Sequence, residues 1–353
     1  MGRRRAPAAD RPPTLATLAE ALGVSRMTVS NAYNRPDQLS PALRSRILAT
    51  AAELGYAGPD PVARTLSRGR TGSIGLVFDY PLTVALTDPA TVELLHGVAA
   101  GCEQRERALS LVPRIAGHDA ALVQRALVDG FVVYCMPDGD ARLAAVRDRR
   151  MPFVLVDHRP QAGTRTVNVD DRGGARATAD HLMALGHRRL GIVCGWEQPV
   201  ATAAEAEAAA VYYVDQERLA GWRAGAEAAG VEWDALPVTS GPGFDRSTGR
   251  IAGLRMLDLP EPPTAVVAFS DRLALGVLDA AAERGVRVPE ELSVAGFDDV
   301  PAAAQGDPPL TTVRQPHEEK GASAMRLLLD DDAPATVALP CELVVRGSTG
   351  PAP

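Results

Sequence analysis

Cysteine is scarce in this sequence, and the few cysteines present form no recognisable motif. Cys102, Cys135, Cys194 and Cys341 lie far apart, and no two of them form a C-x-x-C pair. This spacing excludes a zinc ribbon and a thioredoxin-like redox site, and it favours a reducing, cytoplasmic location. No run of eighteen apolar residues occurs either, so neither a membrane-spanning helix nor a membrane partner is expected.

Sequence motifs for catalysis and for cofactor binding are also missing. The chain contains no G-x-S-x-G, no G-x-x-x-x-G-K-[ST] and no H-E-x-x-H sequence. In its two acidic pairs, Asp170-Asp171 and Asp298-Asp299, the carboxylates are adjacent in sequence, which directs them away from a common substrate bond. We therefore expect no catalytic residue, no metal ion and no cofactor.

Positive charge is concentrated at the N-terminal end. The 353 residues carry a net charge of −7, but residues 1–72 hold eleven arginines against five acids, a net of +6, so the remainder carries −13. Arginine supplies this charge, because Lys320 is the only lysine in the chain. A basic head on an acidic body predicts that only the head meets a polyanion such as DNA. The length and the 46% content of hydrophobic residues predict two or three folded domains.

The N-terminal part predicts an arm followed by three short helices. Residues 1–13 hold four arginines and three prolines without an apolar stretch, which indicates a flexible basic arm and not a secretory signal. Residues 14–58 then contain three candidate helix caps: Thr14, Ser25 and Ser40. The first two helices, joined at Gly23, have the pattern of a helix-turn-helix, for which a plain helical hairpin is the alternative.

The outer face of the second helix, Arg26–Tyr33, carries side chains suited to DNA. Arg26 can pair with guanine and Asn31 with adenine in a major groove. Arg35, Arg44 and Arg46 can reach phosphates, which would set affinity and its salt dependence but not sequence preference.

Residues 59–72 predict a hinge between this head and the rest of the chain. Asp60 and Pro61 can begin a helix of about two turns that extends to Leu66. A helix this short is marginal in water, so we expect it to form only when a partner supports it.

From Ser73 onwards, short apolar strands alternate with amphipathic helices, which predicts parallel α/β layers. The candidate strands are 74–78, 109–112, 130–134, 153–157, 189–194, 265–269 and 292–296, and the candidate helices include 91–107, 173–185, 216–229 and 273–284. About 280 residues are too many for one doubly wound sheet, so two lobes are expected. Ligands of such folds bind at the carboxyl ends of strands. The candidate positions are therefore Asp157-His158, residues 195–200, Ser270-Asp271 and residues 297–299.

A succession of sequence strings between residues 14 and 350 carries a family resemblance. They include TLATLAEALGVSRMTVSNAYN, VARTL before SIGLV, RLAGW, SDRLALG, VPEELSVAGFDD and PPLTTVRQP. Each string is weak alone, but their ordered succession is specific. Together they resemble the lactose-repressor (LacI-type) family of bacterial transcription regulators. The resemblance implies an all-α helix-turn-helix headpiece, a hinge helix and a two-lobed α/β domain with parallel sheets, similar to periplasmic binding proteins.

For DNA, the resemblance implies a homodimer whose second helices enter the major grooves of two operator half-sites. Arg26 and Met27 match the positions that select bases, Asn31 a third contact, and Thr28 and Ser30 phosphate or base contacts. Leu66 matches a leucine that enters the minor groove and kinks the operator, which an apolar wedge can do. Packing of Leu66 on the protein core is the alternative.

For a small-molecule effector, the resemblance implies a site between the two lobes. Asp157, Arg218 and Asp298 match effector contacts, whereas Ser270-Asp271 stands where many members have Asn-Asp, which puts the amide contact there in doubt. Charged groups make strong hydrogen bonds to the hydroxyls of a sugar or a nucleoside. Trp196 and Phe297 are candidates to stack on a ring face. The alternatives are a core position for Trp196 and a helix cap for Asp298-Asp299.

The domain boundaries follow from these assignments. We predict an arm (1–13), a helix-turn-helix domain (14–58), a hinge (59–72) and an effector-binding and dimerisation domain (73–353). Dimerisation is expected through the helices at 91–107 and 273–284. Lobe one is expected at about 73–163 and 298–318, and lobe two at about 164–297 and 319–353. The function expected is that of a cytoplasmic, dimeric, effector-controlled repressor. A sugar-binding receptor or a sugar-processing enzyme without DNA-binding function is the alternative.

Overall fold

The computed structural model describes residues 13–58, 69–117 and 120–353. The chain divides between Thr71 and Gly72 into two compact units, which we call the N-terminal unit and the two-lobed unit. All but the last residue of the predicted arm, and positions 59–68 of the predicted hinge with Leu66 among them, lie outside the described residues. None of the helices in the described parts is long and apolar enough to cross a bilayer.

The N-terminal unit is built from three helices, whose ends lie close to where the caps predict them. They are α1 (Leu15–Leu22), α2 (Arg26–Asn34) and α3 (Pro41–Glu53), with a short 3₁₀ turn, η2 (Pro36–Gln38), between the last two. The hydroxyls of Thr14, Ser25 and Ser40 accept hydrogen bonds from the first-turn amides of the three helices. One small core unites them: Leu18, Ala19, Leu22, Val29, Ala32, Ile47 and Ala51.

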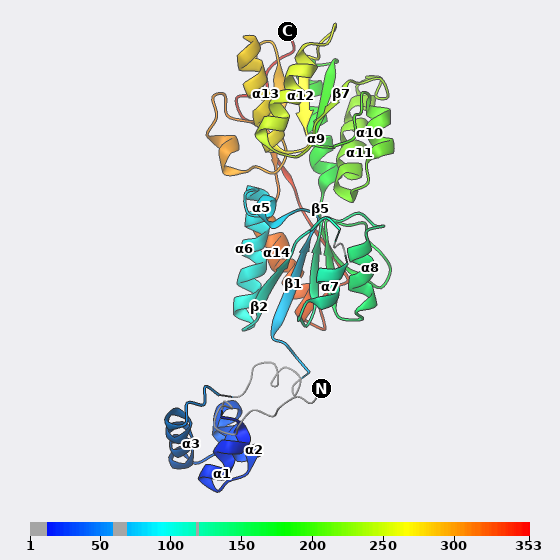
Figure 1. The fold of residues 1–353 in the computed structure, drawn as a ribbon. Helices are drawn as coiled ribbons and strands as arrows, with labels where there is room; N and C mark the ends of the chain where they lie inside the picture. Colours follow the sequence, from blue (N-terminus) through cyan, green and yellow to red (C-terminus); the bar gives the residue numbers. More distant parts are fainter. Residues whose placement is uncertain (1–12, 59–68, 118–119) are drawn as a thin grey trace, which may run out of the picture. The chain divides into compact units, whose positions relative to one another are not determined.

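Lobe one of the two-lobed unit is a parallel sheet covered by helices on both faces (Figure 1). Its strands run in the order β11 (Thr336–Leu339), β5 (Arg165–Val169), β4 (Phe153–Val156), β3 (Phe131–Tyr134), β1 (Ser73–Phe78) and β2 (Ala108–Val112). Its helices are α5 (Leu82–Ala85), α6 (Pro89–Gln104), α7 (Ala121–Arg125), α8 (Ala141–Asp148) and α14 (His317–Leu329). Side chains of α6 and α14 fill the core on one face, and those of α7 and α8 the core on the other.

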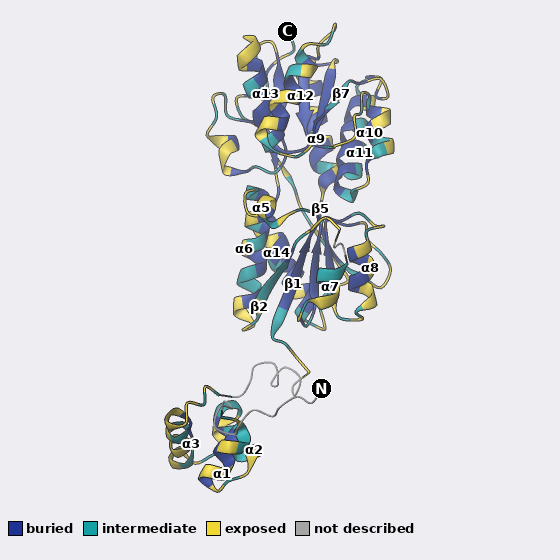
Figure 2. Cartoon of the chain, viewed as in Figure 1, coloured by how far each residue is buried: buried dark blue, intermediate teal, exposed yellow. Residues whose placement is uncertain are grey.

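Lobe two has a smaller parallel sheet in the order β7 (Val238–Ser240), β6 (Leu190–Cys194), β8 (Ala265–Ala268) and β9 (Ser293–Ala295). Its helices are α9 (Asp171–Ala184), α10 (Ala203–Ala209), α11 (Tyr213–Ala228), α12 (Arg246–Leu257), α13 (Asp271–Arg284) and the 3₁₀ turn η3 (Pro301–Ala304). The strands are buried and the helices are exposed only on their outer sides (Figure 2), which is typical of a doubly covered parallel sheet.

The predicted division into lobes is wrong at all three crossovers. Residues 165–169, assigned to lobe two, form β5 and pair with β4 of lobe one. Residues 319–339 also belong to lobe one, because α14 packs against α6 and β11 pairs with β5. Conversely, residues 312–314, assigned to lobe one, form β10 (Thr312–Arg314), which pairs with β12 (Glu342–Val344) and follows a bridge to β9 of lobe two. Long-range strand pairing decides these memberships, and it leaves no periodic pattern in the chain.

Candidate functional site

The helix α2 of the N-terminal unit presents a polar, exposed face. Ser25 caps the helix through a 3.0 Å hydrogen bond from the amide of Thr28, and Val29 and Ala32 bury the opposite face. Arg26 and Met27 are consequently exposed at the first turn, and 70% of Met27 is accessible. Both side chains are therefore accessible to a partner on this face of α2.

Other predicted DNA contacts of this unit are held by neighbours. The Asn31 amide donates to Oε1 of Gln38 at 3.2 Å, and Ser30 Oγ accepts from Asn34 at 3.2 Å. Arg44 on α3 donates through Nε to the carbonyl oxygen of Ala32 at 3.3 Å, which directs its guanidinium along the end of α2. Arg35 is exposed directly after α2. Apart from Leu66, the predicted DNA-binding residues therefore lie on or beside α2.

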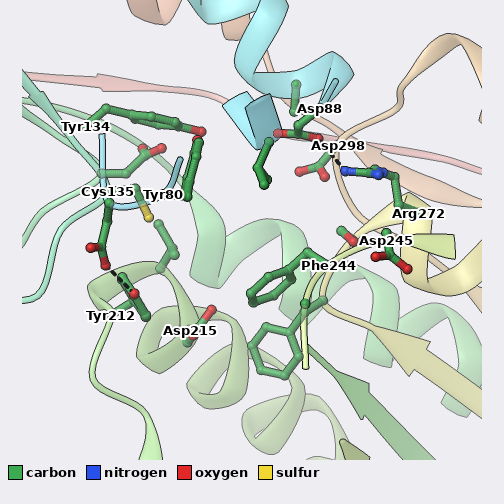
Figure 3. Close-up of a pocket in the computed structure, with 18 of the residues that line it drawn as sticks. Tyr80, Asp88, Tyr134, Cys135, Tyr212, Asp215, Phe244, Asp245, Arg272 and Asp298 are labelled. Atoms are coloured by element: carbon green, nitrogen blue, oxygen red, sulfur yellow. Dashed lines mark hydrogen bonds and ion pairs between the residues drawn. The ribbon is translucent and has the colours of Figure 1, made fainter. Parts of the chain in front are cut away.

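The main cavity of the two-lobed unit lies at the carboxyl ends of the parallel strands, where the two lobes face each other. It has a volume of about 590 Å³, and we call it the inter-lobe cavity. Asp79, Cys135 and Asp157 enter it directly after β1, β3 and β4 of lobe one, and Ser270 closely follows β8 of lobe two. Figure 3 shows labelled side chains of both lobes turned toward this shared space.

A continuous chain of buried hydrogen bonds forms one wall of the inter-lobe cavity. The ammonium of Lys320 donates to Oδ2 of Asp157 at 2.8 Å and to Oε1 of Gln315 at 2.9 Å. The amide of Gln315 in turn donates to Oδ1 of Asp298 at 2.7 Å. Asp157 and Asp298 both adopt positive φ angles, 60° and 117°, as residues at functional sites often do. The only lysine of the chain thus fixes two carboxylates at the cavity.

Hydrogen bonds to Asp171 and Phe269 fix the side chain of Arg218 on α11 with its guanidinium at the cavity. Its Nε donates to Oδ1 of Asp171 at 2.9 Å and its Nη1 to the carbonyl oxygen of Phe269 at 2.5 Å. The guanidinium carbon lies 3.8 Å from the centre of the Phe297 ring, and Nη2 lies 4.0 Å from Oδ1 of Asp298. A buried arginine fixed in this way can donate to a ligand oxygen without further ordering.

Burial shifts the protonation of several cavity side chains. Desolvation raises the pKa of Asp215 to about 7, although the nearby charge of Arg218 opposes the shift. Desolvation also raises the pKa of Asp298 well above its usual value. The pKa of His317 is lowered well below its usual value for the same reason, so its imidazole is neutral at pH 7.

Four of the seven predicted effector contacts line the inter-lobe cavity, and three do not. Asp157, Arg218, Ser270 and Asp298 are in the wall. Phe297 is fully buried beneath the Arg218 guanidinium, and Asp271 accepts buried hydrogen bonds from Thr312 Oγ1 and from the amide of Val300. Trp196 packs on Phe269 and donates from Nε1 to Oδ2 of Asp215 at 2.9 Å. These three side chains lie behind the wall and pack against it. The prediction that they contact a ligand directly is therefore wrong.

Several wall residues were not predicted from the sequence. Tyr134 ends β3 and the others come from loops, turns and helix starts. The full set is Asp79, Tyr80, Asp88, Arg114, Tyr134, Tyr212, Asp215, Phe244, Asp245, Arg272, Gln315, His317 and Lys320. Position after a strand would have indicated Asp79, since it directly follows β1. Phe244, of which 40% is exposed, is an aromatic side chain at the cavity where the sequence indicated Trp196 and Phe297. Within the described parts of the chain, no group of His, Cys, Asp and Glu side chains is arranged to hold a metal ion.

A helix-turn-helix head and a two-lobed α/β unit with a polar cavity define the class of DNA-binding regulators that contain a domain similar to periplasmic binding proteins. Residues 14–58 match the bacterial regulatory proteins of the lacI family, and residues 179–349 match the periplasmic binding protein-like domain. The chain is 41% identical to the HTH-type transcriptional regulator Rv3575c of Mycobacterium tuberculosis (strain ATCC 25618 / H37Rv), over 98% of this chain and 99% of that protein.

Two solved structures show the same fold over nearly the whole chain. The lac repressor dimer bound to operator and the anti-inducer ONPF has a TM-score of 0.76 and 26% identity, with 96% of this chain and 100% of that chain covered. The transcriptional regulator CelR in complex with cellobiose has a TM-score of 0.69 and 29% identity, with 95% and 99% covered. The chain belongs to the LacI family: it is a DNA-binding transcriptional regulator and not an enzyme.

Proposed function

We propose that this protein is a cytoplasmic, dimeric repressor whose affinity for its operator is controlled by a sugar or a nucleoside-like molecule bound in the inter-lobe cavity. The inter-lobe cavity is the observation that carries the proposal. It joins fixed carboxylates and a fixed guanidinium, which hydrogen-bond strongly to hydroxyl groups. The cellobiose in the CelR complex supports a ligand of this kind.

On DNA, α2 is proposed to lie in the major groove, because its exposed face carries donors and an apolar side chain. Arg26, Met27 and Asn31 would contact bases, and Thr28, Ser30, Arg35 and Arg44 would contact phosphates or neighbouring bases. Leu66 is proposed to enter the minor groove at the operator centre, as its match in the family implies.

The effector is proposed to contact Asp157, Arg218, Ser270 and Asp298, with Phe244 beside it. The lobes already bond to each other near these residues: Tyr212 of lobe two donates to Asp79 of lobe one, and Arg272 lies 3.8 Å from Asp88. A ligand that bonds to both lobes favours one relative orientation of the lobes over others. A difference of about 1–3 kcal/mol between the two states is enough to switch operator binding.

Genomic fragments that bind the full-length protein identify the operator, and fluorescence anisotropy then measures its affinity with and without cellobiose, ribose and adenosine. We expect an effector to change the affinity roughly 5- to 150-fold, and binding without effector, or with a corepressor, to lower transcription in vitro. Asp298→Asn should lose the response to the effector. Asp234→Asn, which alters an exposed acid of lobe two outside the cavity, should keep it.

Two results would contradict this function. One is a protein whose operator affinity responds to none of the compounds. The other is an Asp298→Asn variant that responds as the unaltered protein does, which would remove the effector site from the inter-lobe cavity.

A further inference from the structure

The wall of the inter-lobe cavity carries more carboxyl groups than cationic groups. Each cationic side chain among the described wall residues already faces a carboxylate. Lys320 bonds to Asp157 at 2.8 Å, and Arg218 bonds to Asp171 at 2.9 Å. The other two pairs are longer, at 3.8 Å each: Arg114 with Asp79 and Arg272 with Asp88. The wall also carries Glu197, Asp215, Asp245 and Asp298, so carboxyl groups outnumber cations.

An anionic ligand would be disfavoured in such a cavity. A phosphate or carboxylate group would lose its hydration and find no unpaired cation to replace it. Asp245, whose pKa is lowered by hydrogen bonds from Ser247 and Thr248, would also repel it. Taking a cation from its existing partner would leave a buried carboxylate unpaired, which costs several kcal/mol in typical proteins. An uncharged ligand avoids both costs.

Two side chains of the wall retain unused hydrogen-bonding atoms. Within the described residues, Oδ1 of Asp157 and both ring nitrogens of His317 are buried without a hydrogen-bond partner. His317 is 2% exposed, and both residues line the inter-lobe cavity. Because burial lowers its pKa, the neutral His317 ring offers one donor and one acceptor, and Asp157 offers an acceptor. Buried polar atoms are nearly always satisfied, so these atoms indicate a missing partner.

We propose that the effector is an uncharged compound rich in hydroxyl groups, a free sugar in preference to its phosphate or its acid, and that His317 and Asp157 bind its hydroxyls. This inference rests on the proposed effector control and narrows its ligand class. A hydroxyl group both donates and accepts, so it satisfies the carboxylate and either nitrogen of the neutral imidazole. An ammonium group only donates and leaves the N–H of His317 without an acceptor.

Matched compounds test the charge of the ligand on the full-length protein. The probes are ribose and ribose 5-phosphate, glucose with glucose 6-phosphate, glucuronate and glucosamine, adenosine and its monophosphate, and cellobiose. Calorimetry measures binding and operator anisotropy measures the response. We expect binding within the uncharged set, and at least about tenfold weaker binding of each charged derivative than of its parent. A charged derivative that binds better than its parent overturns the inference while the effector control stands. A lack of any response in the whole set counts against the effector control itself.

Substitutions at His317 test its role as a residue that determines specificity. With the uncharged probe that binds best, His317→Phe should weaken binding about tenfold or more, because the ring loses its donor and its acceptor. His317→Gln, which keeps a donor and an acceptor, should restore binding to within about threefold. His181→Gln, outside the cavity in lobe two, should bind like the unaltered protein.

Ligand affinity and melting temperature of the two His317 variants together distinguish a binding role from a structural one. A merely structural histidine would lower the melting temperature in both His317 variants without separating their affinities. Equal ligand affinity of His317→Phe and His317→Gln, in proteins that are both folded by circular dichroism, would remove His317 from the site.

Discussion

At the inter-lobe cavity, residues adjacent in sequence point in different directions, so one lines the cavity and its neighbour does not. Ser270 and Asp298 face the cavity, whereas Asp271 and Phe297, the residue next to each, are buried away from it. Proximity to a strand end therefore indicated residues at and around the cavity, but it could not separate a residue in the wall from one behind it. The prediction that Trp196 stacks on a ligand is wrong for a similar reason, because its indole N–H is directed to Asp215.

Asp215 predicts a pH dependence of stability. Its pKa rises from the usual value of 3.8 to about 7 on folding, so the folded state binds a proton that the unfolded state releases. Its contribution to the free energy of unfolding is therefore lost as pH rises from about 4 to about 7. Asp215→Asn keeps an acceptor for Trp196, and should raise stability at pH 8 by up to about 4 kcal/mol with little change at pH 4.

Thermal unfolding of the unaltered protein and of the Asp215→Asn variant between pH 4 and pH 8 measures this difference. Asp234→Asn, an exposed acid of the same lobe, serves as control and should change little. A stability difference that is the same at both ends of the pH range would contradict a buried, proton-binding Asp215.

Arg26 predicts a change in sequence preference. It is exposed at the first turn of α2, and a bidentate contact from arginine to guanine supplies about 1–3 kcal/mol of discrimination. Arg26→Ala should lose this discrimination at one operator base pair, and it should bind operators with any of the four base pairs at that position equally well. A panel of operators with single base-pair changes, read by anisotropy, measures it. Arg44→Ala should weaken all operators uniformly; equal loss by Arg26→Ala on random duplex would rule out base recognition.

At the scale of secondary structure, the helices α6 and α14 show how a local pattern and a distant partner combine. The sequence pattern predicted a helix over 91–107, and α6 occupies Pro89–Gln104. It did not predict α14, 213 residues further along the chain, which crosses α6 closely enough to need glycine at the contact. A Cβ atom at Gly97 would lie 1.9 Å from the carbonyl oxygen of Glu318.

Gly97→Ala should therefore destabilise the two-lobed unit. The clash involves backbone, which no side-chain rotation relieves, so α6 and α14 must move apart at a cost of about 1–3 kcal/mol. This outweighs the up to about 1 kcal/mol that alanine gains over glycine inside a helix. Urea unfolding measures the loss. Gly139→Ala, where a Cβ meets nothing within 4 Å, should stay near the unaltered value; an equally stable Gly97→Ala would show that the helices do not cross this closely.

At the scale of the whole molecule, the two units carry opposite net charges, +6 for residues 1–72 and −13 for the remainder. The N-terminal unit is attracted to a polyanion and the two-lobed unit is repelled by it, so contact with DNA is directed to the head. The three short helices of the N-terminal unit bury only a small core, so a single head offers a small surface to DNA. A dimer places two heads on the operator at once and raises the operator affinity through effective concentration.

Val92 tests the proposed dimer. It lies on α6, one of the two helices expected to meet the partner copy, and 41% of it is exposed. Val92→Glu would place a charge in an apolar contact and should shift the protein toward the monomer and weaken operator binding about tenfold or more. Analytical ultracentrifugation and anisotropy measure both effects. Ile115→Glu, at a position 46% exposed after β2, is the control; a dimer that tolerates Val92→Glu would place the interface elsewhere.

Local order in this protein follows from its sequence alone. The caps Thr14, Ser25 and Ser40 and the apolar periodicities place the helices of the head, and the apolar runs place β1 to β4, β6, β8 and β9. These features depend on neighbours within a few residues, where backbone hydrogen bonds and side-chain periodicity act directly. Strands β5, β7, β10, β11 and β12 were not predicted, and length is not the reason, because β9 also has only three residues. They are defined by pairing with distant strands, such as β11 with β5 and β10 with β12.

Tertiary structure decided which strand ends meet and which side chains share the inter-lobe cavity. Lys320 and Asp157, 163 residues apart, bond only because α14 returns to lobe one after the chain has built lobe two. The same return buried both ring nitrogens of His317 without a hydrogen-bond partner. Pairing over such distances is set by the burial of whole faces of sheets and helices, a property of the assembled fold that no short stretch of sequence contains.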